Sequence, residues 1–434
     1  MDENQAYFDH MSKELPSRKP ESEKGSGKGL FLAGMITGIA GALLVVAICI
    51  FGIGVQESLE ARGNAGSSVR LNEGSAIDAE LINKLQSLEN TIHQYFYLHE
   101  VSNEELQEGL YRGLLWALQD PYSEYYSAEE LEEILQQTEG IYYGIGAYVT
   151  LDTATSLPKI SGVIEGTPAQ EAGLRTDDII YEVEGVSTYG MSVTEAVGLI
   201  KGPENSQVTL TIVRMGETDY LEFTLTRRKV EAPTVKLTML EDDIAYIELT
   251  EFDEVSIDQF ADALATARGS GMKGLILDLR GNPGGSVNAV VEMCRMILPE
   301  GMIVYTENKE GKRTEYTCDG KRKLEVPMTV LVDGNSASAS EIMAGAIKDY
   351  GIGTLVGTTT FGKGIVQQIL SFMDGSAVKI TISSYFTPKG NNIHGIGIEP
   401  DIECPFDGEA YYGSEDHPDN QLEKAKEVLL EMMK

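Results

Sequence analysis

The chain has 434 residues, among them 68 Asp and Glu against 34 Lys and Arg, which gives a formal net charge of −34 at pH 7. Apolar residues make up 42% of the chain, enough for sizeable cores, so wholesale disorder is excluded. The acidic balance argues against a general nucleic-acid-binding protein. The four scattered cysteines exclude a disulfide-stapled mini-fold and indicate no structural zinc site.

Residues 29–55 contain no charged side chain and are long enough, at about 1.5 Å per residue, to cross a roughly 30 Å hydrocarbon core as a helix. A cleaved signal peptide is the alternative, but its apolar region spans only about 7 to 15 residues, so an uncleaved transmembrane anchor is favoured. Five Lys and Arg precede the segment within residues 1–28, whereas two Arg follow it within residues 56–76. This asymmetry predicts a cytoplasmic tail over 1–28 and an extracytoplasmic location for the rest of the chain.

Residues 56–76 are rich in Gly, Ser, Asn and Ala without an apolar period, which predicts a flexible linker. From 77 to 139 apolar residues recur every three or four positions and predict a helical region. Its second helix is expected to stop at Asp120–Pro121, because the residue before a proline leaves helical space. A third helix begins at the capping box of Ser127 and Glu130.

Residues 140–230 change to short alternating strands separated by two short helices. One helix is expected to end at Gly173, and the other begins at Ser192, with Glu195 as its capping-box partner. The expected strands are 144–149, 159–164, 179–183, 208–213 and 221–225.

Residues 231–434 alternate between strand and helix patterns, which is typical of an α/β core with parallel strand pairing. The expected strands are 244–249, 274–279, 328–332 and 378–385, and the expected helices are 256–267, 287–297, 338–347 and 421–433. Cys294 lies in an apolar run and is expected to be a small buried core residue.

Gly144, Ile145 and Gly146 open the first strand of the middle region. Glycines on both sides of an aliphatic residue let successive backbone N–H groups point one way, and such a nest can hold a peptide's terminal carboxylate. A tight turn is the alternative reading of this motif. With the short segments that follow it, the motif resembles a PDZ domain over about 90 residues. Such a domain would bind C-terminal tails. The segments are 162–164, 167–169, 172–174, 177–180 and 183–185.

Two further motifs lie at strand-to-helix turns. In the segment 278–285, Gly284 and Gly285 expose backbone donors that could form half of an oxyanion hole, although a plain turn with Asp278 and Arg280 as a structural pair is the alternative. In the segment 336–341, Ser338 stands where a nucleophile benefits from N–H groups at a helix start. Ser338 and Glu341 also form a capping box, so Ser338 could merely cap the helix.

Lys363 is flanked by glycines in apolar sequence. If buried, its pKa falls toward neutrality and its free amine can act as a base. Gln367, four positions later, lies on the same face in a helix and in a strand alike, so it can hold the amine by a hydrogen bond. His394 is the rival base, since Ser-His-Asp triads also work, but its place before Gly395 in a loop favours a structural role.

From about residue 80 onward the chain resembles the carboxyl-terminal processing peptidases, or tail-specific serine proteases. The motifs that carry the resemblance are Asp120–Ser123, the PDZ-like segment, 278–285, 336–341, 361–367 and 395–402. The resemblance implies catalytic roles for Ser338, Lys363 and Gln367 and oxyanion donors at Ala339 and the Gly284–Gly285 turn. It also implies a crotonase- or ClpP-like α/β protease core with an inserted PDZ domain and an N-terminal helical region.

The sequence therefore predicts a membrane-anchored, extracytoplasmic serine endopeptidase. Its PDZ domain would hold apolar C-terminal tails on the amides of Gly144, Ile145 and Gly146 and gate the active site. No metal, nucleotide or other cofactor is implied. The resemblance suggests a homodimer and leaves room for an activator protein. The rival hypotheses are a PDZ-based tail-binding scaffold and a crotonase-like acyl-transfer enzyme, which would need coenzyme A.

Overall fold

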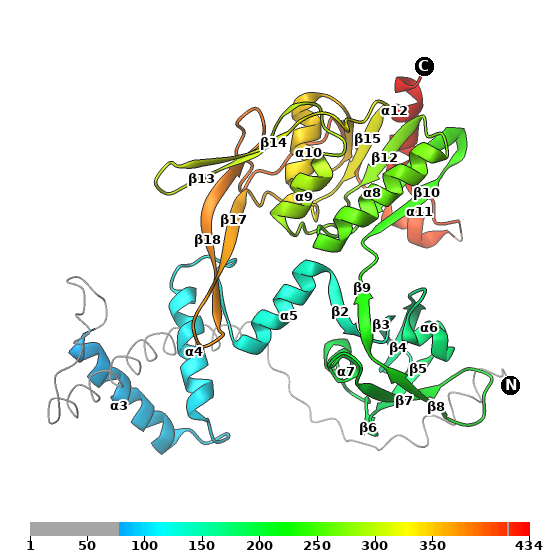
Figure 1. Cartoon of the computed structure of the whole chain (residues 1–434). Coiled ribbons are helices and arrows are strands. Elements are labelled where there is room, and N and C mark those ends of the chain that lie inside the picture. The colour runs from blue at the N-terminus through cyan, green and yellow to red at the C-terminus, as the bar shows by residue number, and fades with distance from the viewer. Residues whose placement is uncertain (1–77, 415) are drawn as a thin grey trace.

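The computed structural model describes residues 78–414 and 416–434. Figure 1 shows N-terminal helices, a small β-rich unit and a larger α/β core. No helix among the described residues is long and apolar enough to cross a membrane. The segment 29–55, for which an anchor is predicted, lies outside the described residues, as do the predicted tail and linker.

The N-terminal region contains three helices held by side-chain caps. They are α3 (Ala79–Tyr95), α4 (Asn103–Trp116) and α5 (Ala128–Glu139), with the short strand β1 (Glu124–Tyr126) before α5. The capping box predicted at Ser127 is present. Helix α4 ends at Trp116, before the predicted stop at Asp120–Pro121, because the chain leaves helical conformation at Gln119 with φ +54°.

The β-rich unit consists of β-strands and two short helices. Its strands are β2 (Ile141–Gly144), β3 (Ala147–Asp152), β4 (Leu157–Val163), β5 (Ile179–Val183), β6 (Val186–Ser187), β7 (Gln207–Val213), β8 (Leu221–Thr226) and β9 (Arg228–Glu231), and its helices are α6 (Pro168–Ala172) and α7 (Val193–Ile200). Strands β3, β4, β5, β7 and β8 form one sheet in that order, with β6 on β5, while β2 pairs with β9. The single strand predicted for 144–149 is wrong, since the chain bends at Ile145–Gly146 between β2 and β3.

The core contains a six-stranded sheet in the order β10-β11-β12-β15-β16-β19, parallel from β11 onward. Its strands are β10 (Val235–Met239), β11 (Ile244–Leu249), β12 (Gly274–Asp278), β15 (Met328–Val332), β16 (Thr354–Gly357) and β19 (Ile402–Glu403). Its helices are α8 (Glu254–Gly269), α9 (Val287–Cys294), α10 (Ala339–Tyr350), α11 (Gly408–Gly413) and α12 (Asn420–Met432), with a 3₁₀ turn η1 (Glu241–Asp243).

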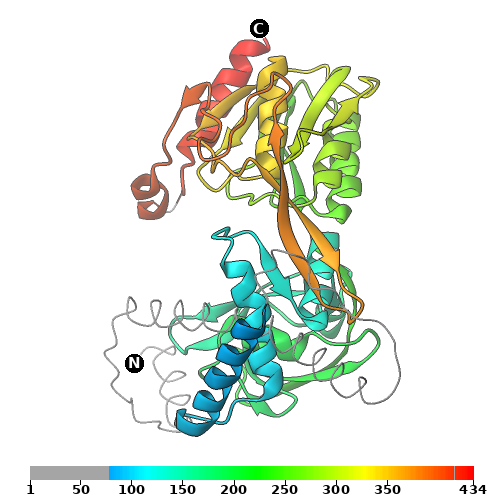
Figure 2. The same cartoon turned by 90° about the vertical axis from the view of Figure 1, so that its left-hand side faces the viewer.

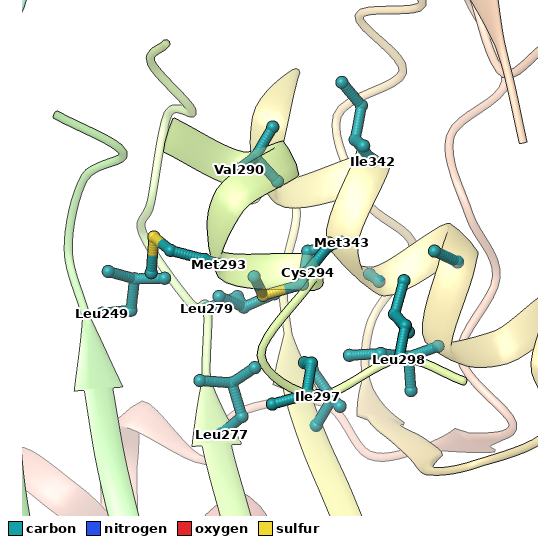
Figure 3. Close-up of a cluster of buried hydrophobic side chains, with 14 of the residues drawn as sticks. Leu249, Leu277, Leu279, Val290, Met293, Cys294, Ile297, Leu298, Ile342 and Met343 are labelled. Atoms are coloured by element: carbon teal, nitrogen blue, oxygen red, sulfur yellow. The ribbon is translucent and has the colours of Figure 1, made fainter. Parts of the chain in front are cut away.

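Helices α8, α9 and α10 cover one face of this sheet and α12 covers the other. Figure 3 shows Leu277 and Leu279 packed with Met293 and Met343 in the core between the sheet and helices α9 and α10. Cys294 is fully buried there, which confirms it as a core residue. This packing holds the ends of β12 and β15, where the two glycine- and serine-rich turns begin.

A second sheet joins the core to the N-terminal region. Its order is β1-β18-β13-β14, with β17 on β18. The core strands of this sheet are β13 (Gly301–Asn308), β14 (Arg313–Cys318), β17 (Ile365–Ser371) and β18 (Ala377–Phe386). Figures 1 and 2 show β17 and β18 running from the core to the N-terminal helices, where β1 pairs with β18. Residues near position 120 are thereby placed beside residues near position 380.

Candidate active site

Ser338 stands at the turn between β15 and α10, with backbone angles φ +54° and ψ −111°. A non-glycine residue rarely adopts such a conformation, and residues held this way cluster at functional sites. Ser338 and Glu341 form the predicted capping box, in which the Glu341 carboxylate accepts from the Ser338 amide at 2.9 Å, but the Ser338 hydroxyl makes no side-chain cap hydrogen bond of ordinary geometry within the described residues. The Tyr385 hydroxyl donates to the Ser338 carbonyl at 3.0 Å and helps to fix the turn.

The serines on either side of Ser338 hold the turn in place. Ser336 is buried and donates to the Leu279 carbonyl at 2.8 Å, while Ser340 is buried and donates to the Asn282 carbonyl at 3.0 Å. Both bonds reach the turn after β12. The hydroxyls of Ser336 and Ser340 are therefore used in structure, which leaves Ser338 as the candidate nucleophile of the motif.

Gly284 and Gly285 lie directly against the Ser338 turn. A Cβ on Gly284 would come within 2.8 Å of the Ser338 Cβ and 2.9 Å of the Ala339 nitrogen. The Gly284 amide donates to Asn282 Oδ1 at 2.9 Å, so it is already occupied. The amides of Gly285 and Ala339 have no acceptor within the described part of the chain, and they are the free donors that an oxyanion could use.

Lys363 lies in the loop between β16 and β17, between two glycines that the packing requires. A Cβ on Gly362 would lie 2.9 Å from the Gly397 nitrogen, and one on Gly364 would lie 2.6 Å from the His394 nitrogen. Burial lowers the pKa of Lys363, and the positive charge of Lys379 lowers it further. The Lys363 Nζ lies 4.5 Å from the centre of the Tyr122 ring.

Glu341 connects the serine turn to the lysine loop. Its carboxylate is fully buried and accepts hydrogen bonds from the amides of Ser338 (2.9 Å), Gly362 (2.7 Å) and Lys363 (2.9 Å). It also accepts from the Thr360 hydroxyl at 2.6 Å. The sequence motif indicated Glu341 only as the partner in a capping box. Its second role was not visible there, because the Lys363 loop is brought to it by the fold.

Ser338, Lys363 and Gln367 line one cavity of about 770 Å³, together with Gly284 and Gly285. Within the described residues no hydrogen bond joins the three side chains. The Gln367 amide nitrogen donates to the Thr381 hydroxyl at 3.1 Å, which leaves the carboxamide oxygen without a partner in the described part of the chain. The expected hydrogen bond between Gln367 and the Lys363 amine is therefore not formed in this conformation.

The rival base His394 is exposed and is not among the residues that line this cavity. Its backbone amide donates to Asn392 Oδ1 at 2.8 Å, which fits the structural role favoured for it. Asp278 pairs with Arg280 at 2.6 Å, and Arg280 also pairs with Asp419 at 2.8 Å. The interpretation of Asp278 and Arg280 as a structural pair is confirmed.

Asp253 also lines the cavity and begins helix α8. Its side chain is buried, and its Oδ2 has no hydrogen-bond partner within the described residues. Burial raises its pKa to about 7, and the nearby charge of Glu251 raises it as well. No motif in the sequence singled out this carboxyl, which could be seen only to precede a predicted helix.

The Gly144–Gly146 motif lies in the β-rich unit. Gly144 pairs with Arg228 in the β2–β9 ladder, while Ile145 and Gly146 form the bend before β3. Gly146 has φ +80°, and a Cβ there would lie 2.3 Å from the Thr167 Cβ, so only glycine fits. The amides of Ile145 and Gly146 find no acceptor among the residues described, and both residues are buried.

Three family models match successive parts of the chain. The model of peptidase family S41 matches residues 243–404, that of a PDZ domain matches 159–214, and that of the N-terminal domain of the activating protease CtpB matches 44–130. The first two matches lie within the core and the β-rich unit, and the third overlaps the N-terminal region.

Curated relatives are similar over most of the chain. The carboxyl-terminal-processing protease of Synechocystis sp. is 34% identical over 361 residues, which cover 79% of this chain and 84% of that protein. The carboxy-terminal processing protease CtpA of Bacillus subtilis is 35% identical over 309 residues, which cover 71% and 66% respectively. Among solved structures, the photosystem II D1 C-terminal processing protease is 30% identical, with a TM-score of 0.45, and the match covers 74% of this chain and 87% of that one.

Proposed function

This chain belongs to the carboxyl-terminal processing proteases of peptidase family S41, serine-type enzymes with a PDZ domain, and we propose that Ser338 is its nucleophile and Lys363 its general base. The observation that carries the proposal is the buried Glu341 carboxylate, which bonds to the amides of both residues and holds them at one cavity. Burial and Lys379 favour the neutral amine that a base must present.

The reaction follows from this arrangement. The neutral amine of Lys363 accepts the proton of the Ser338 hydroxyl as its oxygen bonds to the peptide carbonyl carbon. The oxyanion rests on the amides of Ala339 and Gly285. The lysine then gives its proton to the leaving nitrogen as the C–N bond breaks, which leaves an acyl ester on Ser338. Water, deprotonated by Lys363, then bonds to the ester carbon. The bond between that carbon and the Ser338 oxygen breaks, Lys363 returns the proton to Ser338, and the fragment leaves with a new C-terminal carboxyl group.

The test is cleavage of a loosely folded protein with an apolar C-terminus by the full-length chain in mild detergent. Wild-type protein should release fragments, and Ser338→Ala should release none. Tail binding without cleavage by the wild type would favour the scaffold hypothesis. Equal cleavage by both proteins would mean that Ser338 is not the nucleophile.

The PDZ domain selects substrates by their free C-terminus. The support is the pair of amides at Ile145 and Gly146 that lack an acceptor among the described residues, on a bend that only glycine permits. A fluorescent peptide with an apolar tail should bind, and the same peptide with an amidated C-terminus should bind at least tenfold more weakly. Equal binding of the two peptides would contradict carboxylate recognition by this bend.

Residues 29–55 anchor the protein in the cell membrane, with the catalytic part on the extracytoplasmic side. The support is the uncharged segment and the excess of Lys and Arg before it. The full chain should stay in the membrane fraction at alkaline pH, and external protease should degrade its catalytic part in cells stripped of their wall. Release at alkaline pH, or full protection from external protease, would contradict this topology.

A further inference from the structure

The loop that follows helix α4 comes from outside the protease core and contacts Lys363, a residue that lines the catalytic cavity. It contains Asp120, Tyr122 and Ser123 and leads into β1, which pairs with β18. The Thr381 amide of β18 donates to the Ser123 hydroxyl at 3.1 Å, and Lys379 pairs with Glu124 at 2.9 Å. Figure 2 shows the β17–β18 hairpin running from the core to this region. Two parts of the chain that are far apart in sequence therefore share one hydrogen-bond network.

The centre of that network is the Asp120 carboxylate. Asp120 Oδ2 accepts from the Ser123 and Thr381 hydroxyls, both at 2.6 Å, and Asp120 Oδ1 accepts from the Tyr122 amide at 3.0 Å. These hydrogen bonds lower the pKa of Asp120 against the opposing effect of its burial, so the group is an ionised carboxylate at neutral pH. An ionised carboxylate can only accept hydrogen bonds.

This property fixes the direction of the next bond. Thr381 has one hydroxyl hydrogen, and it is donated to Asp120. The Thr381 oxygen can then only accept from Gln367, whose Nε2 lies 3.1 Å away. The Gln367 carboxamide is thereby held with its nitrogen on Thr381. Its oxygen has no partner within the described residues and is left to accept an N–H of a neighbouring group.

The same loop also supplies the group that the Lys363 amine contacts. The Lys363 Nζ lies 4.5 Å from the centre of the Tyr122 ring, and the Tyr122 amide is bonded to Asp120. Asp120 thus holds the backbone of Tyr122 and, through Thr381, the orientation of Gln367. Lys363 and Gln367 line the same cavity as Ser338.

We propose that Asp120 and Thr381 are positioning residues of the protease: they orient the Gln367 carboxamide so that its oxygen accepts an N–H of Lys363 and leaves the amine lone pair for Ser338. The inference rests on the proposed roles of Ser338 and Lys363. It implies that turnover requires the N-terminal region to stay paired with β18, although that region contributes no group that reacts with substrate.

The test compares Thr381→Val with Thr381→Ser in the full-length protein. Valine has a similar shape but no hydroxyl, so the carboxamide loses its fixed orientation. We expect kcat to fall by roughly 10- to 100-fold with KM within about twofold, because a misoriented base slows the chemical step more than binding. Serine keeps the hydroxyl and should restore kcat to within about threefold of wild type.

Ser376→Ala is the matched control, since it removes a hydroxyl–carboxylate bond to Asp374 in the same hairpin without touching Gln367. It should leave kcat unchanged. Thermal unfolding and titration of the reactive serine report the folded fraction of each variant, so kcat is given per active site. A kcat of Thr381→Val equal to that of Thr381→Ser would overturn the proposal.

Asp120→Asn gives an independent readout through pH. The charged and titratable groups around the Lys363 amine are Asp120, Tyr122, Glu124 and Lys379. The Asp120 charge raises the pKa of Lys363, so its removal should shift the rise of kcat/KM to lower pH as well as reduce kcat. An unshifted profile with full kcat would contradict the proposal. Equal cleavage by wild type and Ser338→Ala would overturn the proposed function itself and this inference with it.

Discussion

Lys363 can act as the proposed base only while its amine is neutral, and its surroundings set the pH at which that occurs. Burial and Lys379 lower its pKa, while Asp120 and Glu124 raise it. Activity should therefore rise with pH through a midpoint below the ordinary lysine value of 10.5. This direction follows because the deprotonated form, which accumulates above the pKa, is the active one.

Replacing Lys379 tests this electrostatic account. Lys379→Gln removes a positive charge near Lys363 and frees the Glu124 carboxylate from its 2.9 Å ion pair. Both changes stabilise the Lys363 ammonium, so the rise of kcat/KM should move to higher pH. The pH dependence of kcat/KM measures the shift, and movement to lower pH would contradict the assignment of Lys363 as the base.

Glu341 is the residue on which the geometry of the site depends most. Four donors, three amides and one hydroxyl, meet its buried carboxylate. Glu341→Gln replaces one acceptor oxygen by a donor NH₂, which leaves buried amides unpaired at a cost of about 1–3 kcal/mol each. We expect a lower melting temperature and a loss of kcat of at least 100-fold. A wild-type kcat in Glu341→Gln would show that the site does not need the Glu341 carboxylate to link the Ser338 turn to the Lys363 loop.

At the scale of elements, the N-terminus of α8 carries a buried carboxyl whose ionisation opposes folding. The pKa of Asp253 is about 7 in the folded protein against an ordinary value of 3.8. Between about pH 4 and pH 7 the unfolded chain releases this proton while the folded protein keeps it. The contribution of Asp253 to the free energy of unfolding therefore falls as pH rises through this window, and above it the full penalty remains.

Asp253→Asn removes that penalty because asparagine cannot ionise and is as good an N-cap as aspartate. The variant should be more stable than wild type by about 1–3 kcal/mol at pH 8, with a smaller difference at pH 5. Urea unfolding at the two pH values measures this difference. If the difference in free energy of unfolding between Asp253→Asn and wild type is the same at both pH values, the raised pKa of Asp253 is contradicted.

The sequence predicted elements best where the local chemistry is explicit. Ser127 and Ser192 begin helices with capping boxes, as their motifs indicated. Strands β13, β14 and β17 were not predicted. Strands β14 and β17 pair with their sequence neighbours β13 and β18, but both are largely exposed and lack a clear apolar alternation, while β13 pairs with the distant β18 as well. Helix α9 ends at Cys294, three residues before the predicted end, because the chain continues in tight turns in which the amides of Met296 and Ile297 bond three residues back.

At the scale of the whole molecule, the site is assembled from parts that no local pattern connects. Ser338, Lys363 and Gln367 could be proposed from motifs and a family resemblance. The contact of Asp120 with Thr381 spans 261 positions and depends on the pairing of β1 with β18. Likewise, the second role of Glu341 needs the Lys363 loop to fold back onto α10. Such long-range contacts follow from tertiary packing, so they could not be predicted from spacing alone.

The most direct test of the account is covalent labelling of the nucleophile by a fluorophosphonate, with the modified residue identified by peptide mass spectrometry. We predict one adduct, on Ser338, in the full-length wild type, and labelling at least 100-fold slower in Lys363→Ala with an unchanged melting temperature. Labelling of Lys363→Ala at the wild-type rate, or an adduct on another serine, would contradict the assignment of Ser338 and Lys363 as nucleophile and base.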